Sequence, residues 1–286
     1  MAEIFDVSWL AQRLNQKDIL VVDSRPPVKY LQGHVPGAVN LPSSKIFHPT
    51  SLELLPVDQL ASVFAEKGVD ENRTVVFYDG YDGQNAAILA WTLEFLGHRR
   101  VGLLSRFIEG WEDEAGELLY RPVKPEPRVF RAKPNQAIRA TIDKVQNRGD
   151  YKLVDLRSSE EFLGKLSTEP RRGRLPEAIS LPWTSLLGQN NGLFRPRNDL
   201  EKTVAERGLR PSDHIITYCS FGPRAALGYV ALSQLGFEDI RVYDGSFHQW
   251  AQHQELPVET DTLIGASSRI ASCVDPFQVL SPSPST

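Results

Sequence analysis

The feature of this sequence that most constrains its fold is an internal repeat, because landmarks of the first half return in the same order about 140 residues later. The segment Val75–Asp79 reads like Ile215–Cys219, and in both a tyrosine precedes the last residue. Four more matched pairs are Val21–Arg25 with Leu153–Arg157, Leu41-Pro42 with Leu181-Pro182, Leu96-Gly97 with Leu235-Gly236, and Trp111 with Trp250. Ordered matches at nearly constant spacing predict two copies of one domain.

Each copy alternates short apolar runs with segments of helical spacing. The apolar runs are typical of buried parallel strands, and they are Ile19–Val22, Val75–Tyr78, Lys152–Val154 and Ile215–Tyr218. Helices are expected over Ala86–Leu96 and Ala225–Leu235, each followed by a glycine that suits a helix end. This alternation predicts an α/β fold in which each copy is a parallel β-sheet covered by helices on both faces. Functional sites in such sheets lie beyond the carboxyl ends of the strands.

The expected domains are residues 1–120 and 135–257, joined by a linker over 121–134 that begins with three prolines in seven residues. Residues 258–286 end in a Ser-Pro repeat and are expected to form a flexible tail. No run of 18 apolar residues is present, and the first residues carry Glu3 and Asp6 rather than a basic signal start. We therefore expect a soluble cytoplasmic protein that is not inserted in a membrane.

The charge is modest and unevenly divided. Residues 1–126 hold 12 Lys and Arg against 18 Asp and Glu, whereas residues 127–286 hold 20 against 18. The second half therefore suits a small anion, but its excess is too small for a nucleic-acid partner. No histidine–cysteine cluster has zinc spacing and no glycine-rich phosphate loop follows a first strand, so neither a metal nor a cofactor is expected.

Cys219 is the strongest candidate for a reactive group. It follows an expected strand and precedes an expected helix, with the loop Ser220, Phe221, Gly222, Pro223 and Arg224 between them. Such a loop turns backbone N–H groups inward, and the helix dipole adds partial positive charge, so a thiolate or a persulfide anion would be stabilised there. Gly222 permits a tight turn, Pro223 suits a first helical turn, and Arg224 adds a permanent charge.

At these residues the chain resembles the rhodanese family, in particular its two-domain sulfurtransferases. Cys219–Arg224 fits the family loop C-x-x-G-x-R, and Asp244–Trp250 resembles its D-G-S/G-W-x-x-W segment with Phe247 in place of the first Trp. Asp23–Arg25 and Gly33–Ala38 fit its D-x-R and G-H-I-P-G-A patterns. The resemblance covers about residues 5–257.

The resemblance implies sulfur transfer through a Cys219 persulfide, from thiosulfate or 3-mercaptopyruvate to cyanide or a thiol, which a thiol protein could also supply. It also implies an inert first domain, since Asp79 stands at the cysteine position. Three departures leave the donor open. Phe221 replaces the serine of mercaptopyruvate users, Ser220 and Phe221 replace the two cations of vertebrate thiosulfate users, and Glu161 stands where both kinds carry an arginine.

Several other residues receive expected roles. Arg171, Arg172 and Arg224 are candidates for binding the anionic donor. Asp155 and Arg157 are expected to fix the loop as a charge pair, and Ser246 to cap the helix that contains Trp250. His34 and His248 are interpreted as structural, and Cys273 as incidental. The supporting residues are therefore Asp155, Arg157 and Ser246.

Two other functions remain as alternatives. A cysteine phosphatase needs five residues between its cysteine and its arginine, whereas only four lie between Cys219 and Arg224, which makes a cradle tight for phosphate. A non-enzymatic persulfide carrier or interaction module would also fit a duplicated chain with one degenerate copy. Continuous turnover distinguishes an enzyme from such a carrier, and thiosulfate stands slightly ahead of 3-mercaptopyruvate as the donor.

Overall fold

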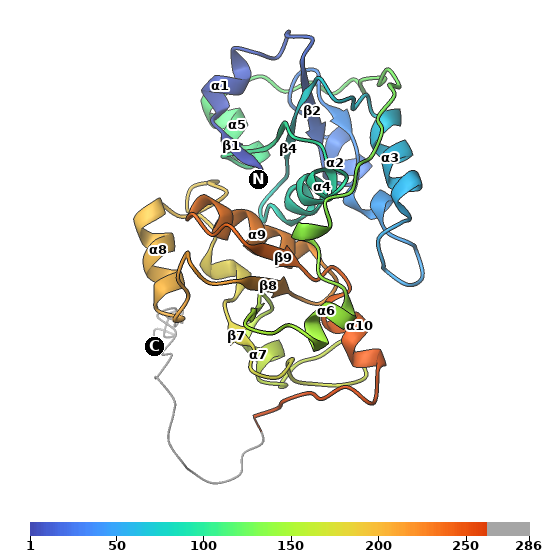
Figure 1. The fold of residues 1–286 in the computed structure, drawn as a ribbon. Coiled ribbons are helices and arrows are strands. Elements are labelled where there is room, and N and C mark those ends of the chain that lie inside the picture. Colours follow the sequence, from blue (N-terminus) through green and yellow to red (C-terminus); the bar gives the residue numbers. More distant parts are fainter. Residues whose placement is uncertain (262–286) are drawn as a thin grey trace, which may run out of the picture.

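The computed structural model describes residues 1–261, which form two parallel sheets (Figure 1). The first sheet has the order β1-β5-β4-β2-β3 and the second β7-β6-β8-β9. The strands are β1 (Glu3–Phe5), β2 (Ile19–Asp23), β3 (Val39–Asn40), β4 (Thr74–Tyr78), β5 (Val101–Leu104), β6 (Lys152–Asp155), β7 (Ile179–Ser180), β8 (Ile215–Tyr218) and β9 (Ile240–Val242). All their pairings are parallel, as the alternating pattern predicts.

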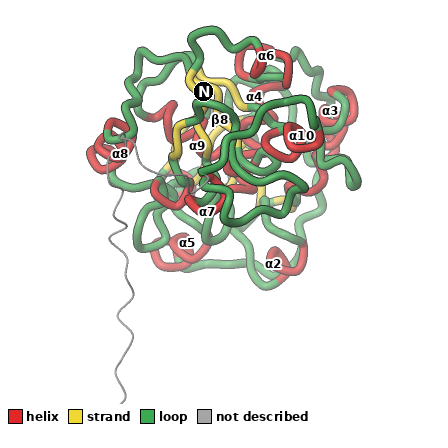
Figure 2. The backbone as a smooth tube through the Cα atoms, turned by 90° about the horizontal axis from the view of Figure 1, so that it is seen from below, coloured by secondary structure: helices red, strands yellow, loops and turns green. Residues whose placement is uncertain are grey.

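Helices surround the strands, which lie near the middle of the molecule in Figure 2. The α-helices are α1 (Val7–Ala11), α2 (Pro27–Leu31), α3 (Val57–Glu66), α4 (Gln84–Phe95), α5 (Ile108–Ala115), α6 (Ile142–Gln146), α7 (Ser159–Phe162), α8 (Arg197–Ala205), α9 (Pro223–Gln234) and α10 (Ser246–Gln252). Three short 3₁₀ helices are η1 (Ser43–Ile46), η2 (Gln136–Ile138) and η3 (Trp183–Ser185). None of the helices within residues 1–261 has the length and apolar character needed to cross a bilayer.

Successive strand residues enter cores on opposite faces of their sheet. In β4, Val76 joins a cluster with residues of α1 and α5, whereas Val75 and Phe77 join the cluster that contains α3 and α4. In the second sheet, Ile216 faces residues of α6 and α10 while Ile215 faces α8 and α9. Both sheets are therefore covered on both faces, which confirms the predicted α/β architecture.

A shared core joins the two halves. Helices α4 and α9 lie between the two sheets (Figure 1) and pack against each other, with nine buried residues on each. Their apolar side chains belong to one continuous cluster that includes both domains. Backbone bonds reinforce the junction, because Leu193 N donates to Ser105 O at 2.9 Å and Phe107 N donates to Asn191 O at 2.9 Å. The two copies are therefore one packed unit.

The segment between the copies lies along the first domain. Val123 N donates to the Tyr30 hydroxyl at 2.9 Å, Arg128 N to Ala65 O at 2.9 Å, and Lys133 N to Leu96 O at 2.8 Å. At the other end, Glu259 exchanges two backbone hydrogen bonds of 2.9 Å with Arg174, so part of the expected tail packs on the second domain. Residues 262–286, with Cys273, lie outside the described residues.

Two equivalent glycines allow a test of how tightly the linker is packed. Gly97 and Gly236 each follow the helix that begins after a carboxyl-edge loop, with φ +92° and +87°. A Cβ added at Gly97 would lie 2.3 Å from the Lys133 carbonyl oxygen, whereas one at Gly236 meets nothing within 4 Å. We expect Gly97→Ala to lower the free energy of unfolding in urea by about 3 kcal/mol and Gly236→Ala by about 1 kcal/mol. Equal losses would contradict the close linker packing.

Candidate active site at Cys219

Cys219 directly follows β8 at the carboxyl edge of the second sheet, where α9 begins four residues later. Its side chain is buried, with 1% of the residue exposed. Gly222, at φ +113°, brings the loop close to the next strand end, since a Cβ there would lie 3.3 Å from Asp244 O. Pro223 is the first residue of α9, as the sequence predicts. The structure therefore confirms the predicted strand–loop–helix position of Cys219.

The sulfur lies among hydrogen-bond donors. Gly222 N donates to Cys219 Sγ at 3.2 Å, whereas the Ser246 hydroxyl, 3.9 Å from the sulfur, donates its proton to Tyr243 O at 2.8 Å. In the first turn of α9, the amides of Arg224 and Ala225 form no hydrogen bond with any residue of 1–261. First-turn amides point out of the helix toward its N-terminus, which here is the cysteine loop. The site can therefore hold a negatively charged sulfur.

Ser246 binds the backbone of the cysteine loop, and its predicted capping role is wrong. No side chain caps α10, which begins at Ser246 with φ +54°. Instead, Ser246 Oγ accepts a bond from Cys219 N at 3.1 Å and donates to Tyr243 O at 2.8 Å. Two α10 amides then bind the loop carbonyls, because Phe247 N donates to Cys219 O at 3.0 Å and His248 N to Ser220 O at 2.8 Å. Ser246 thus fixes the cysteine backbone.

Asp155 and Arg157 form the predicted charge pair, fully enclosed beneath the loop. Arg157 Nη2 lies 2.6 Å from Asp155 Oδ2 and also donates to Gly173 O at 2.8 Å. Burial strongly raises the pKa of Tyr218, with the Asp155 charge acting in the same direction. Tyr218 therefore keeps its proton, and its hydroxyl accepts a bond from Leu175 N at 3.2 Å. This cluster holds the end of β8 against its neighbours.

Arg224 does not present a free charge, because it is clamped by Glu161. Arg224 Nη1 lies 2.7 Å from Glu161 Oε2 and Nη2 lies 3.0 Å from Oε1. Ser220 Oγ also donates to Glu161 Oε1 at 3.0 Å. Burial acts to raise the pKa of Glu161, but the bonds from Arg224, Ser158 and Ser220 lower it to about 2. Glu161 is therefore ionised, and the pair is electrically neutral as a whole.

Arg171 is bound near the C-terminal end of α10, and Arg172 lies beside it in the sequence. Arg171 Nη1 donates to His253 O at 2.8 Å, and His253 follows the C-terminal end of α10. Cys219 contacts the opposite end of that seven-residue helix, about 10 Å away at 1.5 Å per residue. Arg172 is exposed. Their role in binding the donor stays a prediction.

The remaining candidates lie as follows. His248 Nδ1 is 3.0 Å from Glu169 Oε2, and His34 is buried against Tyr30, with ring centroids 3.9 Å apart, so both histidines have structural contacts. Phe221 is 44% exposed at the tip of the loop. The sequence interpretation noted Glu161 but missed its contact with the cysteine loop. Its only local signal is the capping box of α7, in which Glu161 pairs with Ser158.

The first domain holds an anion in the equivalent loop. Asp79 follows β4, and its carboxylate accepts bonds from the backbone N–H groups of Gly80 at 2.9 Å, Asn85 at 2.8 Å and Ala86 at 3.3 Å. Burial raises the pKa of Asp79 to about 6, and the nearby Asp82 adds to that shift. The loop that surrounds a sulfur in one copy is thus filled by a carboxylate in the other.

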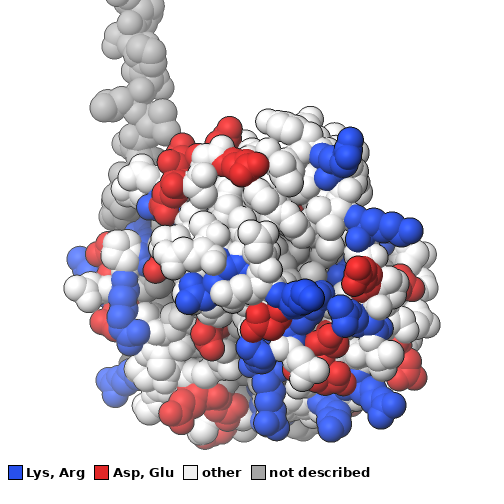
Figure 3. All heavy atoms as spheres, turned by 90° about the horizontal axis from the view of Figure 1, so that it is seen from above, with Lys and Arg blue, Asp and Glu red and all other residues white. Residues whose placement is uncertain are grey.

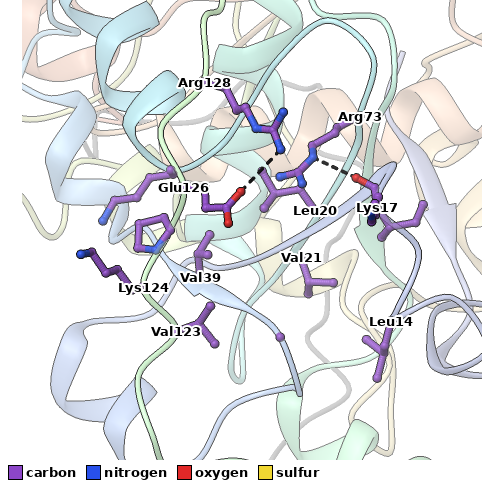
Figure 4. Close-up of a pocket in the computed structure, with 14 residues that line it drawn as sticks. Leu14, Lys17, Leu20, Val21, Val39, Arg73, Val123, Lys124, Glu126 and Arg128 are labelled. Atoms are coloured by element: carbon purple, nitrogen blue, oxygen red, sulfur yellow. Dashed lines mark hydrogen bonds and ion pairs between the residues drawn. The ribbon is translucent and has the colours of Figure 1, made fainter.

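A cavity in the described part of the chain lies away from the cysteine loop. A cavity of about 480 Å³ opens between the linker and the first domain, and Figure 4 shows Arg73, Lys124 and Arg128 around it. It shares no residue with the loop. No group of three potential metal-ligating side chains occurs in the described residues. On the face in Figure 3, Lys and Arg side chains are interspersed with Asp and Glu, with no continuous basic surface.

Comparison with known proteins gives consistent matches along most of the chain. A putative thiosulfate sulfurtransferase of Synechococcus elongatus is 32% identical, over 88% of this chain and 83% of that protein. A thiosulfate sulfurtransferase of Corynebacterium glutamicum is 33% identical, over 90% of each. Among solved structures, the anaerobic ergothioneine biosynthesis enzyme of Chlorobium limicola matches in fold, with a TM-score of 0.82 at 22% identity over 91% of this chain and 70% of that one.

A family model described as the rhodanese-like domain matches the sequence twice, over residues 6–114 and 139–253. The two matches fall on the two sheets described above and include both Asp79 and Cys219. With its duplicated fold and its cysteine loop at the carboxyl edge of the second sheet, the chain belongs to the rhodanese family.

Proposed function

We propose that the protein is a sulfurtransferase that carries a sulfane sulfur on Cys219. One observation carries the proposal, namely a buried cysteine sulfur that accepts the Gly222 N–H at 3.2 Å beside the N-terminus of a twelve-residue helix. A thiolate in that position is a nucleophile, and the same donors can receive the outer sulfur of a persulfide. Relatives named thiosulfate sulfurtransferase, at about 30% identity, support this reaction class.

The reaction proceeds in two transfers. In the first, with thiosulfate, the Cys219 thiolate attacks the outer sulfur, the S–S bond breaks and sulfite leaves. With 3-mercaptopyruvate, the thiolate attacks the thiol sulfur, the C–S bond breaks, and the pyruvate enolate leaves and takes up a proton. In the second, the acceptor attacks the outer sulfur of the persulfide, so that the Cys219 thiolate is regenerated. With cyanide as the acceptor the product is thiocyanate, and with a thiol it is a new persulfide.

Thiosulfate is the first donor to test and 3-mercaptopyruvate the second, because the names of the relatives mention only thiosulfate. The acceptor is cyanide in an assay, or a small thiol or thiol protein. Because only 1% of Cys219 is exposed, a donor or acceptor must reach the sulfur with a narrow end of its molecule. A phosphatase reaction is disfavoured because four residues separate Cys219 from Arg224, and the guanidinium is already bound by Glu161.

Cys219→Ala is expected to abolish thiocyanate formation from thiosulfate and cyanide while the thermal unfolding temperature stays within a few degrees. Cys273→Ala is the matched control and should keep turnover within about twofold. Mass spectrometry of the wild type after exposure to the donor should find about 32 Da added at Cys219.

Retained turnover in Cys219→Ala would exclude the proposed mechanism. Formation of one equivalent of thiocyanate with no further turnover would instead identify a carrier. Hydrolysis of an aryl phosphate faster than sulfur transfer from thiosulfate would favour the phosphatase.

Ser246→Ala removes the acceptor of the Cys219 N–H and is expected to lower the free energy of unfolding by about 1–2 kcal/mol. Because the loop then loses its fixed backbone, the rate of persulfide formation should fall roughly tenfold in stopped-flow measurements. Ser62→Ala is the control, since that hydroxyl donates to Asp58 O on the exposed face of α3 in the first domain. Unchanged loading in Ser246→Ala would show that the hydroxyl does not position the cysteine.

A further inference from the structure

The cavity of about 480 Å³ between the linker and the first domain lies at the amino edge of the first sheet. Among its lining residues, Ile19 is the first residue of β2, Val39 is the first residue of β3, and Arg73 directly precedes β4. Because these strands run parallel, Asp79 lies at the opposite edge, after the end of β4. The cavity is therefore separate from both carboxyl-edge loops, and sulfur transfer at Cys219 does not account for it.

The lining of this cavity is strongly positive. Five of its fourteen residues are cations and one is a carboxylate, which gives a formal charge of +4. Yet residues 1–126, which supply all but one of these charged groups, hold six more Asp and Glu than Lys and Arg. Cations thus gather here against the balance of the surrounding sequence, and a hollow lined by one sign of charge attracts ions of the other sign. The five cations are Lys17, Lys67, Arg73, Lys124 and Arg128.

The guanidinium of Arg73 is held by backbone carbonyls rather than by a carboxylate. Its Nε donates to Lys17 O at 3.0 Å (Figure 4), and its Nη1 donates to Gly68 O at 3.2 Å. Asp70 accepts only the backbone N–H of Arg73, at 3.1 Å. Within residues 1–261, Nη2 forms no hydrogen bond. The two carbonyls fix the direction of the guanidinium without neutralising its charge, so Arg73 can still bind an anion.

Lys67, which follows the C-terminal end of α3, is half-buried. Its ammonium group forms no hydrogen bond or salt bridge in the described part of the chain. Burial lowers the pKa of Lys67 and the charge of Lys45 acts in the same direction, whereas Glu66 opposes the shift. The helix dipole favours a lysine at this end of α3 but does not give its ammonium group a bound acceptor. An anion in the cavity would supply one.

The rest of the lining is mostly aliphatic. Leu20, Val21 and Val39 are buried, and the linker contributes Val123 and Pro125. A volume of about 480 Å³ lies in the range of small-molecule sites. An inorganic anion would leave most of that volume unfilled, and an uncharged molecule would leave the cations without a counter-charge. The lining therefore fits a molecule that has both an anionic group and an apolar body.

We propose that this cavity binds a small organic phosphate with an aliphatic body. A phosphate monoester carries nearly two negative charges at neutral pH and three acceptor oxygens, which matches several cations better than a carboxylate does. Arg73 and Lys67 are the half-buried donors to the phosphate, and the aliphatic body packs against β2, β3 and the linker. The site does not involve Cys219, so it stands independently of the proposed sulfurtransferase function.

The test is isothermal titration calorimetry of the full-length protein at low ionic strength with three probes. Hexyl phosphate has both the dianionic group and an aliphatic body, inorganic phosphate lacks the body, and hexanoate carries a single charge. Hexyl phosphate is expected to bind at one site per chain, at least about tenfold more tightly than either of the others. Added salt should weaken its binding.

Lys67→Gln is expected to weaken hexyl phosphate binding about tenfold, because it removes a charged donor from the phosphate. Glutamine has nearly the helix propensity of lysine, so the thermal unfolding temperature should stay within a few degrees. Lys202→Gln is the matched control, since Lys202 is exposed on α8 in the second domain. It should leave the dissociation constant within about twofold.

Acetylation of the wild type gives a second readout that needs no variant. With hexyl phosphate at ten times its dissociation constant, the rate at which acetic anhydride modifies Lys67 should fall about tenfold, as followed by mass spectrometry. The rate at Lys202 should not change.

Absence of binding by hexyl phosphate, equal affinity in Lys67→Gln and the wild type, or unprotected acetylation of Lys67 would each overturn the site. Inorganic phosphate that binds as tightly as hexyl phosphate would overturn the role of the aliphatic lining. None of these results bears on sulfur transfer at Cys219.

Discussion

The packing of α4 against α9 is the constraint on which the rest of the structure depends. Each helix begins directly after the carboxyl-edge loop of its own sheet, so their contact fixes both loops at once. Ile88 of α4 even reaches the cysteine loop, since a Cβ on Gly222 would lie 3.6 Å from its side chain. The domain without a cysteine therefore takes part in shaping the loop that has one.

The two copies share one way of holding an anion at a strand end. Beneath each loop lies an Asp–Arg pair with a buried tyrosine, Asp23 with Arg25 and Tyr78 in the first copy and Asp155 with Arg157 and Tyr218 in the second. The copies differ in the group that the loop encloses. A carboxylate already accepts the amides of the first loop, whereas in the second loop the Gly222 N–H donates to the Cys219 sulfur.

The sequence was sufficient to predict four strands, β2, β4, β6 and β8, the α4 and α9 helices and the position of Cys219, because these follow from apolar runs and from the repeat. The remaining strands β1, β3, β5, β7 and β9 were not predicted. Contacts between distant segments were not predictable in this way. Glu161 and Arg224 lie 63 positions apart on different helices, and Ser246 binds the backbone of Cys219, which lies 27 positions earlier. Arg171 donates to His253 O at the C-terminal end of α10, and no spacing in the sequence reveals that contact.

The shared core also limits how this protein can change. Nine residues of α9 are buried, many of them in the core shared with the first copy. A shortened chain that kept only the copy with Cys219 would therefore expose the apolar face of this helix to water. The copy without a cysteine is therefore a structural half of the fold, since removing it would uncover the core that it shares with α9.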